Sequence, residues 1–516
     1  MTVSNPHLKT GTSRADDPPE DCPENRYSTA PEQAEPCDHQ RAHITDSRFH
    51  GGGYATAASR RIFCDQCRLQ RWLWVEAALA SCQERLGIVA PGTAAQLARA
   101  CEPGRIDLAA LAPEFRRTGH SLVPLLRGLE AACEGASGEM VHLGATTQDI
   151  QDTAQSLEVR EVLAEVDAGM RTMTVTLADL AVRHRNSLMP GRTHGQPALP
   201  TTFGLKVAGW LDELLRHAER LEQLRPRVLT AQLSGGVGTM AGFDGRGREL
   251  LDMFARDLEL SVPEVGWHAA RDRVAEFGAA SAMLTGTLAR IADEIRVLSR
   301  PEVGEVSEGW QYGRVGSSTM PHKRNPERSA QVVLLARLAR SNAALGIESM
   351  VQEHERDSRG LRMEWVAVAD VSHYTLAALD ILNDVLSGLQ VDSGRMAANA
   401  WTAAESLCTE AVMLALAPSI GRQSAHVLVY ELSQRAQSTG KRLRDCLLAD
   451  ATVTAQLSAA EVDDLLDPSR YLGESRELTD LSVDRAQKWL ASTQPSRTQP
   501  SRTQPPGTGV PKGAHA

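Results

Sequence analysis

Long stretches of the chain repeat apolar residues every three or four positions, which is the spacing of an amphipathic α-helix. The first such stretch covers residues 68–79. The same spacing predicts helices over residues 153–183, 203–224, 273–298, 330–351 and 363–389. Several of these are longer than an average globular helix and are typical of a helical bundle. Strand patterns are nearly absent, so the pattern predicts an all-α protein.

Both ends of the chain lack this periodicity. Residues 1–45 are rich in Pro, Asp, Glu, Ser and Thr, which predicts a disordered arm. Residues 491–516 contain two consecutive SRTQP repeats followed by a tail with Pro and Gly, which predicts a second disordered segment. The folded body is therefore expected to span residues 46–490.

The composition supports a helical chain with ample core, because 42% of the residues are hydrophobic and only 4% are aromatic. The net charge of −10 argues against non-specific nucleic-acid binding. Nine cysteines, most in apolar or helical contexts, fit a reducing compartment. Residues 1–21 are polar and lack the charged-then-apolar pattern of a signal peptide, and the best apolar run, residues 332–347, is interrupted by Arg337 and Arg340. We therefore expect a cytoplasmic protein that binds neither membrane nor nucleic acid.

Polar segments between the predicted helices are natural places for chemistry. The first such segment, residues 142–153, has Thr146, Thr147 and Asp149 directly before a helix. These side chains can cap the free N–H groups of the helix or hold a carboxylate there. For this segment alone, capping is the more common role.

The second polar segment, residues 191–204, places Arg192 and His194 between glycines. A single histidine in a loop is more often structural than catalytic. The neighbouring arginine favours an anion site only modestly, and Arg192 itself is expected to be structural.

The third polar segment, residues 316–326, reads Gly-Ser-Ser-Thr-Met-Pro-His-Lys-Arg-Asn-Pro. It matches the signature G-S-S-x-M-P-x-K-x-N-P, and the chain resembles the fumarase/aspartase superfamily over about residues 46–490. The first two polar segments match the other two active-site segments of that superfamily, in the same order.

The resemblance implies a mostly α-helical subunit with three domains. These are an N-terminal helical domain (46–155), a central helical bundle (156–400) with the signature loop at 314–326, and a C-terminal helical domain (401–490). It also implies a homotetramer in which each active site is built from three subunits, one polar segment from each. No cofactor and no metal are expected.

The resemblance further implies how the site works on a small dicarboxylate. A proton on carbon beside a carboxylate is weakly acidic, so its removal requires a base and stabilisation of the doubly charged intermediate. Ser317 is the implied base, with Lys323 as a source of positive charge near it. Lys323 and Asn325 are expected to hold the carboxylate on which charge accumulates, and Thr146 and Thr147 the other carboxylate. The loop is expected to close over the substrate.

Three more residues are predicted to contact the substrate: His142, Gln232 and Arg356. For Arg356, as for Arg359, solvation of a helix end is an equally good interpretation. The pair Cys64 and Cys67 stands at the start of a helix with no second pair nearby, which favours a structural role over zinc or redox chemistry.

His194 matches the residue that acts as general acid in adenylosuccinate lyase. In many members its acidic partner is a Glu four residues after the last Pro of the signature, but this chain has Ala330 there. Glu327 and Glu353 are not obvious substitutes. A histidine without a carboxylate partner is a weaker proton donor, which favours a leaving group that departs as a stable anion.

Other stretches resemble the 3-carboxymuconate cycloisomerase branch, among them residues 271–276, 302–306 and 352–357, and Ala330 fits it too. Bacterial cycloisomerases, however, generally carry Trp where this chain has His194. We predict a cofactor-independent lyase that eliminates a group from a 2-substituted succinate and releases fumarate, with nitrosuccinate, releasing nitrite, as the leading substrate.

Three alternatives remain open. The first is an adenylosuccinate- or argininosuccinate-type C–N lyase, and the second is a 3-carboxy-cis,cis-muconate cycloisomerase. The third is a non-enzymatic structural protein, against which the intact Ser317, Lys323 and Asn325 argue.

Overall fold

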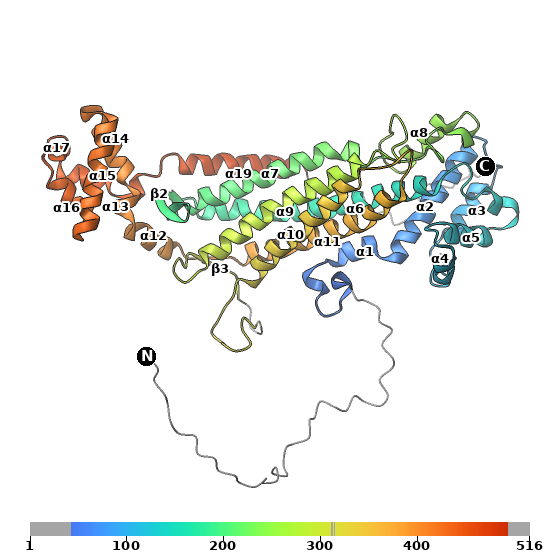
Figure 1. Cartoon of the computed structure of the whole chain (residues 1–516), viewed down its shortest axis with the longest axis horizontal. Coiled ribbons are helices and arrows are strands. Elements are labelled where there is room, and N and C mark those ends of the chain that lie inside the picture. The colour runs from blue at the N-terminus through green and yellow to red at the C-terminus, as the bar shows by residue number, and fades with distance from the viewer. Residues whose placement is uncertain (1–42, 311–312, 314, 494–516) are drawn as a thin grey trace, which may run out of the picture.

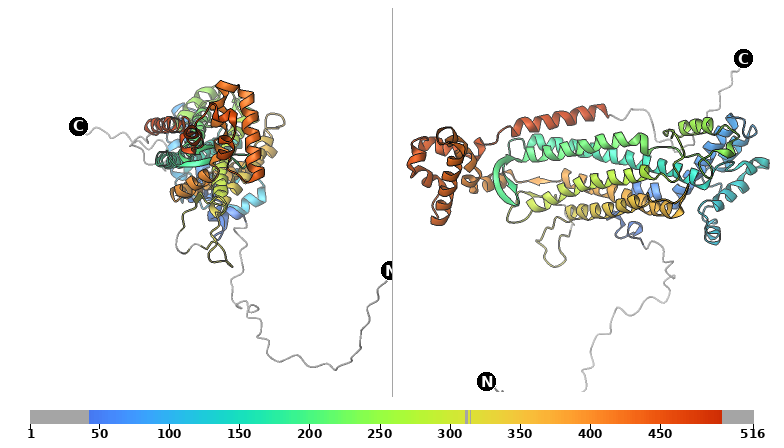
Figure 2. Two further views of the ribbon diagram at one scale, coloured as in Figure 1. Left: turned by 90° about the vertical axis from the view of Figure 1, so that its left-hand side faces the viewer. Right: turned by 45° about the horizontal axis from the view of Figure 1, so that its top comes forward.

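Five long helices form the centre of an elongated molecule (Figure 1). The computed structural model describes residues 43–310, 313 and 315–493, so the arms predicted at 1–45 and 491–516 lie outside the described residues except at their inner edges. The long helices are α6 (Thr147–Arg183), α7 (Phe203–Val228), α9 (Asp272–Leu298), α10 (Glu327–Glu348) and α11 (Ser358–Ser387). They pack side by side along the molecule in both further views (Figure 2). The predicted all-α fold with a central bundle is confirmed.

The bundle is held by apolar stripes on each helix. On α6 the fully buried positions include Val166, Met170, Met173 and Leu177, which recur every three or four residues. Each buried side chain of this size contributes roughly 1.5–3 kcal/mol relative to the exposed state. α6 begins six residues before the predicted helix, so the polar residues 147–152 form its first turns.

A second core lies at the end of the molecule where α6 begins. Leu157 of α6 belongs to this core and Val159 to the bundle core, so the helix passes from one core to the other close to the predicted boundary at 155/156. The segment from Ala231 to Leu260 also packs here, although it is distant in sequence. The helices of this end are α1 (Ala57–Phe63), α2 (Asp65–Arg85), α3 (Thr93–Ala100), α4 (Ala112–Thr118), α5 (Val123–Ala132) and α8 (Gly247–Asp257), with 3₁₀ turns at Ile44–Asp46, Gly51–Gly53, Gly135–Met140 and Ala241–Phe243.

A third core occupies the opposite end of the molecule and contains Val412, Leu416 and Leu432. The last helix, α19 (Ser475–Ser492), leaves this end and packs on α7 and α6, where Val483 and Ala486 join the bundle core. The segment predicted as a C-terminal domain, 401–490, therefore ends in a helix of the bundle. The other elements of this end are α12 (Ser393–Thr402), α13 (Ala404–Leu407), α14 (Thr409–Ile420), α15 (Arg422–Thr439), α16 (Leu443–Leu448), α17 (Ala451–Thr454), α18 (Ala459–Leu465) and a 3₁₀ turn at Pro468–Arg470.

The polar segment at 191–204, expected to be a loop, is largely a β-hairpin. Strands β1 (Leu188–Thr193) and β2 (Gln196–Thr202) pair in antiparallel register, with Thr193 opposite Gln196. The two residues of the turn, His194 and Gly195, both have positive φ (52° and 78°), as a type I′ hairpin turn requires. A second short antiparallel pair joins β3 (Val306–Ser307) to β4 (Gln390–Val391).

Within the described residues, α11 is the one helix long and apolar enough to span a membrane, by length and composition alone. Inside the protein, 72% of its apolar window is buried, against α10, α9 and α6 among others. The burial is that of a core helix of the bundle. The run singled out from the sequence, residues 332–347, lies instead in α10.

Candidate active site

The two predicted threonines stand at the start of α6, where Thr146 is the N-cap residue and Thr147 the first helical residue. Both are partly open to solvent. Asp149, fully buried one turn on, accepts the N–H of Thr146 (3.0 Å) and, from the segment after α7, the N–H groups of Ser234 and Gly235 (both 2.9 Å). One carboxylate therefore fixes the start of α6 against a chain segment more than eighty residues away.

The exposed Arg356 precedes α11, and its guanidinium donates a hydrogen bond to the hydroxyl of Thr146. Arg359, in contrast, pairs with Asp357 and Glu353 on its own segment, and its hydrogen bonds to Asp357 lower the pKa of that carboxyl to about 2. The contacts of Arg359 are those of an arginine that solvates a helix end. Arg356 instead faces the threonine segment, where a substrate carboxylate is expected.

Two more predicted contacts differ in accessibility. His142 is partly exposed, and its Nδ1 lies 2.6 Å from Oε1 of the buried Glu76 on α2. Gln232 is completely buried, and its side-chain oxygen accepts the N–H of Trp267 (3.1 Å). Gln232 thus lies beneath the segment that Asp149 anchors rather than on its surface, and its predicted contact with substrate stays a prediction.

The signature loop is folded around Ser317. The hydroxyl oxygen of this half-buried serine accepts the N–H groups of Met320 (3.0 Å) and Thr319 (3.3 Å). The two arms of the loop meet at Gly316, where a Cβ would lie 2.2 Å from the carbonyl oxygen of Lys323. Only glycine permits this approach.

Two other predicted residues lie in the same loop. The side chain of Lys323 is exposed. Asn325 donates through its Nδ2 to the carbonyl of Gly316 (2.9 Å) and to Glu327 (3.2 Å), so both N–H donors of its amide are engaged within the loop. Glu327 is therefore occupied by Asn325, as Glu353 is by Arg359.

His194 occupies the exposed turn of the β1–β2 hairpin. Within the part of the chain that the structure describes, its ring has no hydrogen-bonded or ionic partner. Arg192 on the same hairpin donates to both oxygens of the completely buried Glu305 (2.6 and 2.9 Å), which also accepts from Asn399 (2.8 Å). Arg192 therefore has the structural role expected of it.

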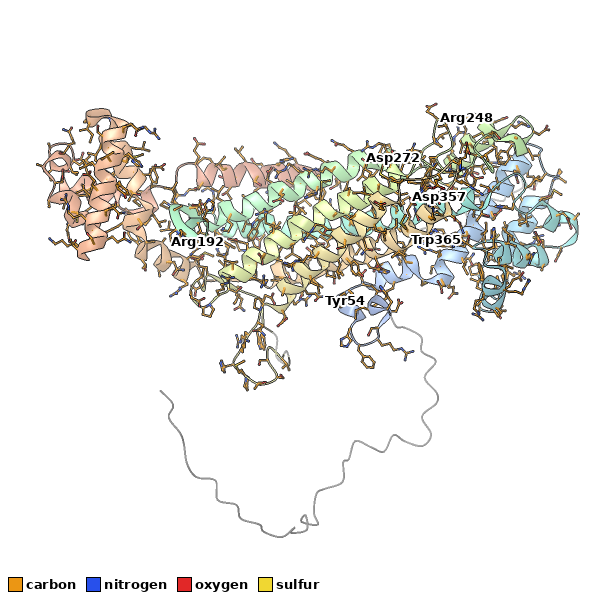
Figure 3. All side chains as sticks on the ribbon, viewed as in Figure 1. Tyr54, Arg192, Arg248, Asp272, Asp357 and Trp365 are labelled. Atoms are coloured by element: carbon orange, nitrogen blue, oxygen red, sulfur yellow. The ribbon has the colours of Figure 1, made fainter. Side chains whose placement is uncertain are left out.

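The three polar segments do not meet within one chain. Figure 3 places Arg192, and so the hairpin, at the end of the bundle next to the C-terminal helices, while Asp357, which follows Arg356, lies near the other end. The signature loop hangs from a third position, close to β3 (Figure 1). Thr146 and Arg356 are in contact, whereas Ser317 and His194 lie elsewhere on the chain.

Sequence reasoning missed the partners that hold these residues. Glu76, Asp149 as an anchor, and Glu305 are each far in sequence from the group they bind, so no local spacing could reveal them. Glu76 does carry one signal, since it is an acidic residue within an otherwise apolar stretch.

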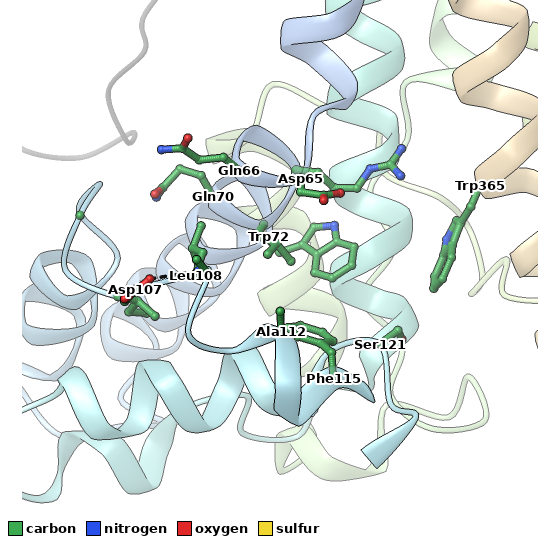
Figure 4. Close-up of a pocket in the computed structure, with 15 residues that line it drawn as sticks. Asp65, Gln66, Gln70, Trp72, Asp107, Leu108, Ala112, Phe115, Ser121 and Trp365 are labelled. Carbon is green, nitrogen blue, oxygen red and sulfur yellow. Dashed lines mark hydrogen bonds between the residues drawn. The ribbon is translucent and has the colours of Figure 1, made fainter. Parts of the chain in front are cut away.

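A cavity of about 930 Å³ opens near the start of α11 (Figure 4). Its lining is mostly apolar and includes Trp72 of α2, Phe115 of α4 and Trp365 of α11, with Ser121 at one edge. Ser121 accepts a hydrogen bond from Gln151 (2.9 Å), which is in the first turns of α6. The cavity therefore adjoins the helix whose start carries Thr146.

No group of three or more His, Cys, Asp or Glu side chains in the described part of the chain is arranged to hold a metal ion. The sulfur of Cys64 caps α2 by accepting the N–H of Cys67 (3.4 Å), in agreement with the structural role predicted for this pair. The cysteines that the structure describes are all free thiols.

Comparison with known proteins points to the same family as the signature does. A family model described as Lyase matches residues 53–339, and one described as Adenylosuccinate lyase C-terminus matches residues 406–481. The chain is 38% identical over 453 residues to N-acetyl-S-(2-succino)cysteine lyase from Enterococcus italicus, covering 88% of this chain and 98% of that protein.

A second relative is 3-carboxy-cis,cis-muconate cycloisomerase from Pseudomonas aeruginosa, which is 38% identical over 426 residues and covers 82% of this chain and 93% of its own length. Among solved structures, a fumarate lyase from Mesorhizobium sp. BNC1 has a TM-score of 0.78 and 35% identity, covering 84% of this chain and 98% of that chain. The helical bundle, the signature loop and these relatives together define a lyase-type enzyme. The chain belongs to the fumarase/aspartase superfamily.

Proposed function

We propose that the protein is a lyase that eliminates an anionic leaving group from a 2-substituted succinate and releases fumarate. The observation that carries the proposal is the setting of Ser317, whose oxygen accepts two backbone N–H groups inside the superfamily signature. Backbone donors of this kind stabilise negative charge on the oxygen, which makes an alkoxide base accessible. Such a base can remove a proton from the carbon beside a carboxylate.

The other residues divide between the two carboxylates of the substrate. Lys323 and Asn325 hold the carboxylate next to the deprotonated carbon, where charge accumulates. Asn325 would exchange its exposed contact with Glu327 for this role. Thr146, Thr147 and Arg356 hold the second carboxylate, at a helix start where the helix dipole favours an anion. That second carboxylate is attached to the carbon that carries the leaving group.

The site would be completed by assembly. Ser317, the threonine segment and His194 lie on separate parts of one subunit, so we propose a homotetramer in which three subunits contribute one segment each. Intersubunit complementation tests this arrangement. A mixture of subunits carrying either Ser317→Ala or Thr146→Val should regain about a quarter of wild-type activity after joint refolding, because some sites then receive both intact segments. No recovery, or a fully active monomer, would contradict shared sites.

Nitrosuccinate is the specific substrate that we propose first. Among the described residues of its own chain, His194 has no carboxylate partner, and Ala330 stands where an acidic side chain would be expected. A nitro group leaves as nitrite, which is a weak base and needs no proton at the moment of departure.

A thioether of succinate is the second candidate. It is favoured by the identity with N-acetyl-S-(2-succino)cysteine lyase, and a thiolate is likewise a moderately stable anion. The cavity lined by Trp72 and Trp365 is large enough to receive the remainder of such a leaving group. A cycloisomerase is the remaining alternative, and it would consume a conjugated dienoic acid rather than form fumarate.

The deciding experiment measures fumarate formation by ultraviolet absorbance with nitrosuccinate, N-acetyl-S-(2-succino)cysteine and adenylosuccinate in turn. We expect turnover of at least one of the first two, with nitrite or free thiol formed in equal amount. Ser317→Ala should lower kcat by about a thousandfold or more. The matched control is Ser318→Ala, an exposed neighbour in the same loop, which should retain most activity. An active Ser317→Ala enzyme would exclude Ser317 as the base.

A further inference from the structure

The buried carboxylate of Glu76 contacts His142, which stands four residues before Thr146. Nδ1 of His142 lies 2.6 Å from Oε1 of Glu76, whose side chain is only 1% exposed. Within the described residues, the other oxygen, Oε2, is buried without a hydrogen-bond partner. An ionised buried carboxylate needs a compensating charge, and the imidazole is the group in direct contact that can supply it.

The backbone fixes where the imidazole lies. His142 adopts a left-handed conformation (φ 62°), and its carbonyl accepts the N–H of Ala145 (3.3 Å), which closes a turn that leads into Thr146. Gln83, two helical turns after Glu76 on α2, donates to the carbonyl of Leu143 (2.8 Å). α2 therefore holds both the ring and the backbone of this turn.

The turn from His142 to Ala145 also packs closely against Gly242 and Phe243 on the side opposite α2. At Gly144 (φ 74°) a Cβ would lie 2.6 Å from the carbonyl of Gly242 and 2.7 Å from the ring of Phe243. The left-handed conformation of His142 is also unfavourable for a residue with a Cβ. The surrounding contacts maintain this strained conformation, which is a pattern found at functional sites.

The charges around His142 favour the imidazolium. Burial lowers its pKa, but the hydrogen bond and charge of Glu76 from α2, and the charge of Asp149 from α6, outweigh burial and raise it above the ordinary value. The thiol of Cys101, which also faces Glu76, has its pKa raised by burial and by that carboxylate, and so stays neutral. With Nδ1 bound to Glu76, the proton on Nε2 remains available, and 17% of the side chain is exposed.

We propose that His142, oriented by Glu76, is the group that assists the leaving group. The inference rests on the proposed function, in which Thr146 and Thr147 hold the carboxylate attached to the carbon that bears the leaving group. His142 and Thr146 are joined by the short turn that ends at Ala145, so the inference puts the imidazole on the side of the substrate that carries the leaving group. His142 is then a catalytic residue, and Glu76 is a positioning residue that acts through it.

The proton balance is simple. Ser317 takes the proton from the carbon beside the first carboxylate, and the electron pair of that C–H bond forms the double bond. The bond from the other carbon to the leaving group breaks, and its electron pair departs with that group. With nitrite, Nε2–H of His142 donates a hydrogen bond and keeps its proton. With a thiolate, which is more basic, it transfers the proton and later regains one from water.

This assignment gives His142 the role for which His194 lacks a partner. It predicts that the need for His142 grows with the basicity of the leaving group. The test compares kcat and KM for nitrosuccinate and N-acetyl-S-(2-succino)cysteine over a range of pH, in the wild type, Glu76→Gln, His142→Gln and His194→Gln. The control is Glu84→Gln, a change of a second glutamate on α2 that contacts the N–H of Ala94 instead.

For the thioether we expect His142→Gln to lower kcat by about a hundredfold, the usual contribution of a general acid, with a smaller loss for nitrosuccinate. In Glu76→Gln the alkaline limb of the kcat profile should move down by about one pH unit or more, because the stabilising carboxylate is gone. KM should change little. Glu84→Gln should leave both profiles in place.

Isotope-labelled histidine NMR supplies a readout that needs no turnover. His142 should titrate above the ordinary histidine range in the wild type and lower in Glu76→Gln. A wild-type His142 that titrates at or below that range overturns the inference even if the lyase activity is found. An unshifted alkaline limb in Glu76→Gln, or equal losses with both substrates, overturns it as well. If neither substrate reacts, the proposed function fails, and the NMR titration still decides the state of the pair.

Discussion

Arg271 joins three helices at the end of the bundle that carries Thr146, and its removal tests how that end is held. Its guanidinium donates to both oxygens of Asp152 on α6 (2.7 and 2.9 Å) and to both oxygens of Glu364 on α11 (2.8 and 2.5 Å). The three side chains are at most 1% exposed. Burial raises the pKa of Glu364, and the contact with Arg271 only partly offsets this.

Replacing Arg271 by Met keeps most of the volume of the side chain and removes the charge. Two buried carboxylates are then left without their cation, and breaking a buried pair in this way costs about 3–5 kcal/mol. The loss should depend on pH. Arg271 lowers the pKa of Glu364, so without it the pKa of this buried carboxyl lies further above the unfolded value, and the folded variant binds more protons than the unfolded chain. Its stability therefore falls as the pH rises, and the deficit shrinks on acidification.

Urea unfolding at about pH 5.5 and about pH 8, followed by the exchange of amide hydrogens in α6 and α11, measures both effects. The control is Arg273→Met, which removes a half-buried arginine that donates to the carbonyl of Arg227 (2.7 Å) rather than to a carboxylate. We expect about 1 kcal/mol or less from the control, independent of pH. An Arg271→Met variant as stable as the control, or equally weakened at both values, would refute this reasoning.

Asp149→Asn should leave the N–H of Ser234 or of Gly235 without a proper acceptor, which costs about 2–4 kcal/mol of stability. KM should rise because the start of α6 shifts. Calorimetry and kinetics measure both effects, and an unchanged KM would count against Asp149 as the residue that fixes the start of α6. His217 and His373 are buried, which lowers the pKa of each from 6.5 to about 4. Both are neutral in the folded protein, so stability should be full above pH 6.5 and fall as the pH drops towards 4, by roughly 3 kcal/mol for each histidine. Denaturant titrations of the wild type and of His373→Gln should show a shallower acid loss in the variant, and parallel curves would exclude His373 as a source.

The helices of the bundle could be predicted because their apolar period is a local property of the sequence. The residues of the signature could be recognised by identity alone. The hairpin could not be predicted, because its strands contain three prolines and two polar ends and show no alternation of apolar and polar residues. Its turn is identified only by the positive φ of His194. The packing of α19 on the bundle could not be predicted either. The apolar face of α19 would fit the core of the C-terminal end as well as the core of the bundle, and the local sequence does not distinguish the two.

The partners of the site residues were out of reach for a different reason. Glu76 stands 66 positions before His142, and Arg271 stands 119 positions after Asp152. Each pair is formed only when the helices pack, so neither period nor spacing along the chain contains it. The sequence shows that Ala330 stands where an acidic partner of His194 is expected. That Glu76 lies beside His142 could be learned only from the folded structure.

The polar segments also differ in how they are attached to the rest of the chain, and this bears on the order of events in the proposed reaction. In the threonine segment the buried Asp149 binds the backbone of Ser234 and Gly235, which follow α7, and in the hairpin Arg192 binds the buried Glu305. In the signature loop the contacts of Ser317 and Asn325 are with residues of the same loop or the first turn of α10. Segments held only by local contacts open at low free energy. In the proposed mechanism, the surface that binds the carboxylate beside the leaving group is therefore rigid before substrate arrives, whereas the proposed base, Ser317, belongs to the part that can move, as loop closure requires.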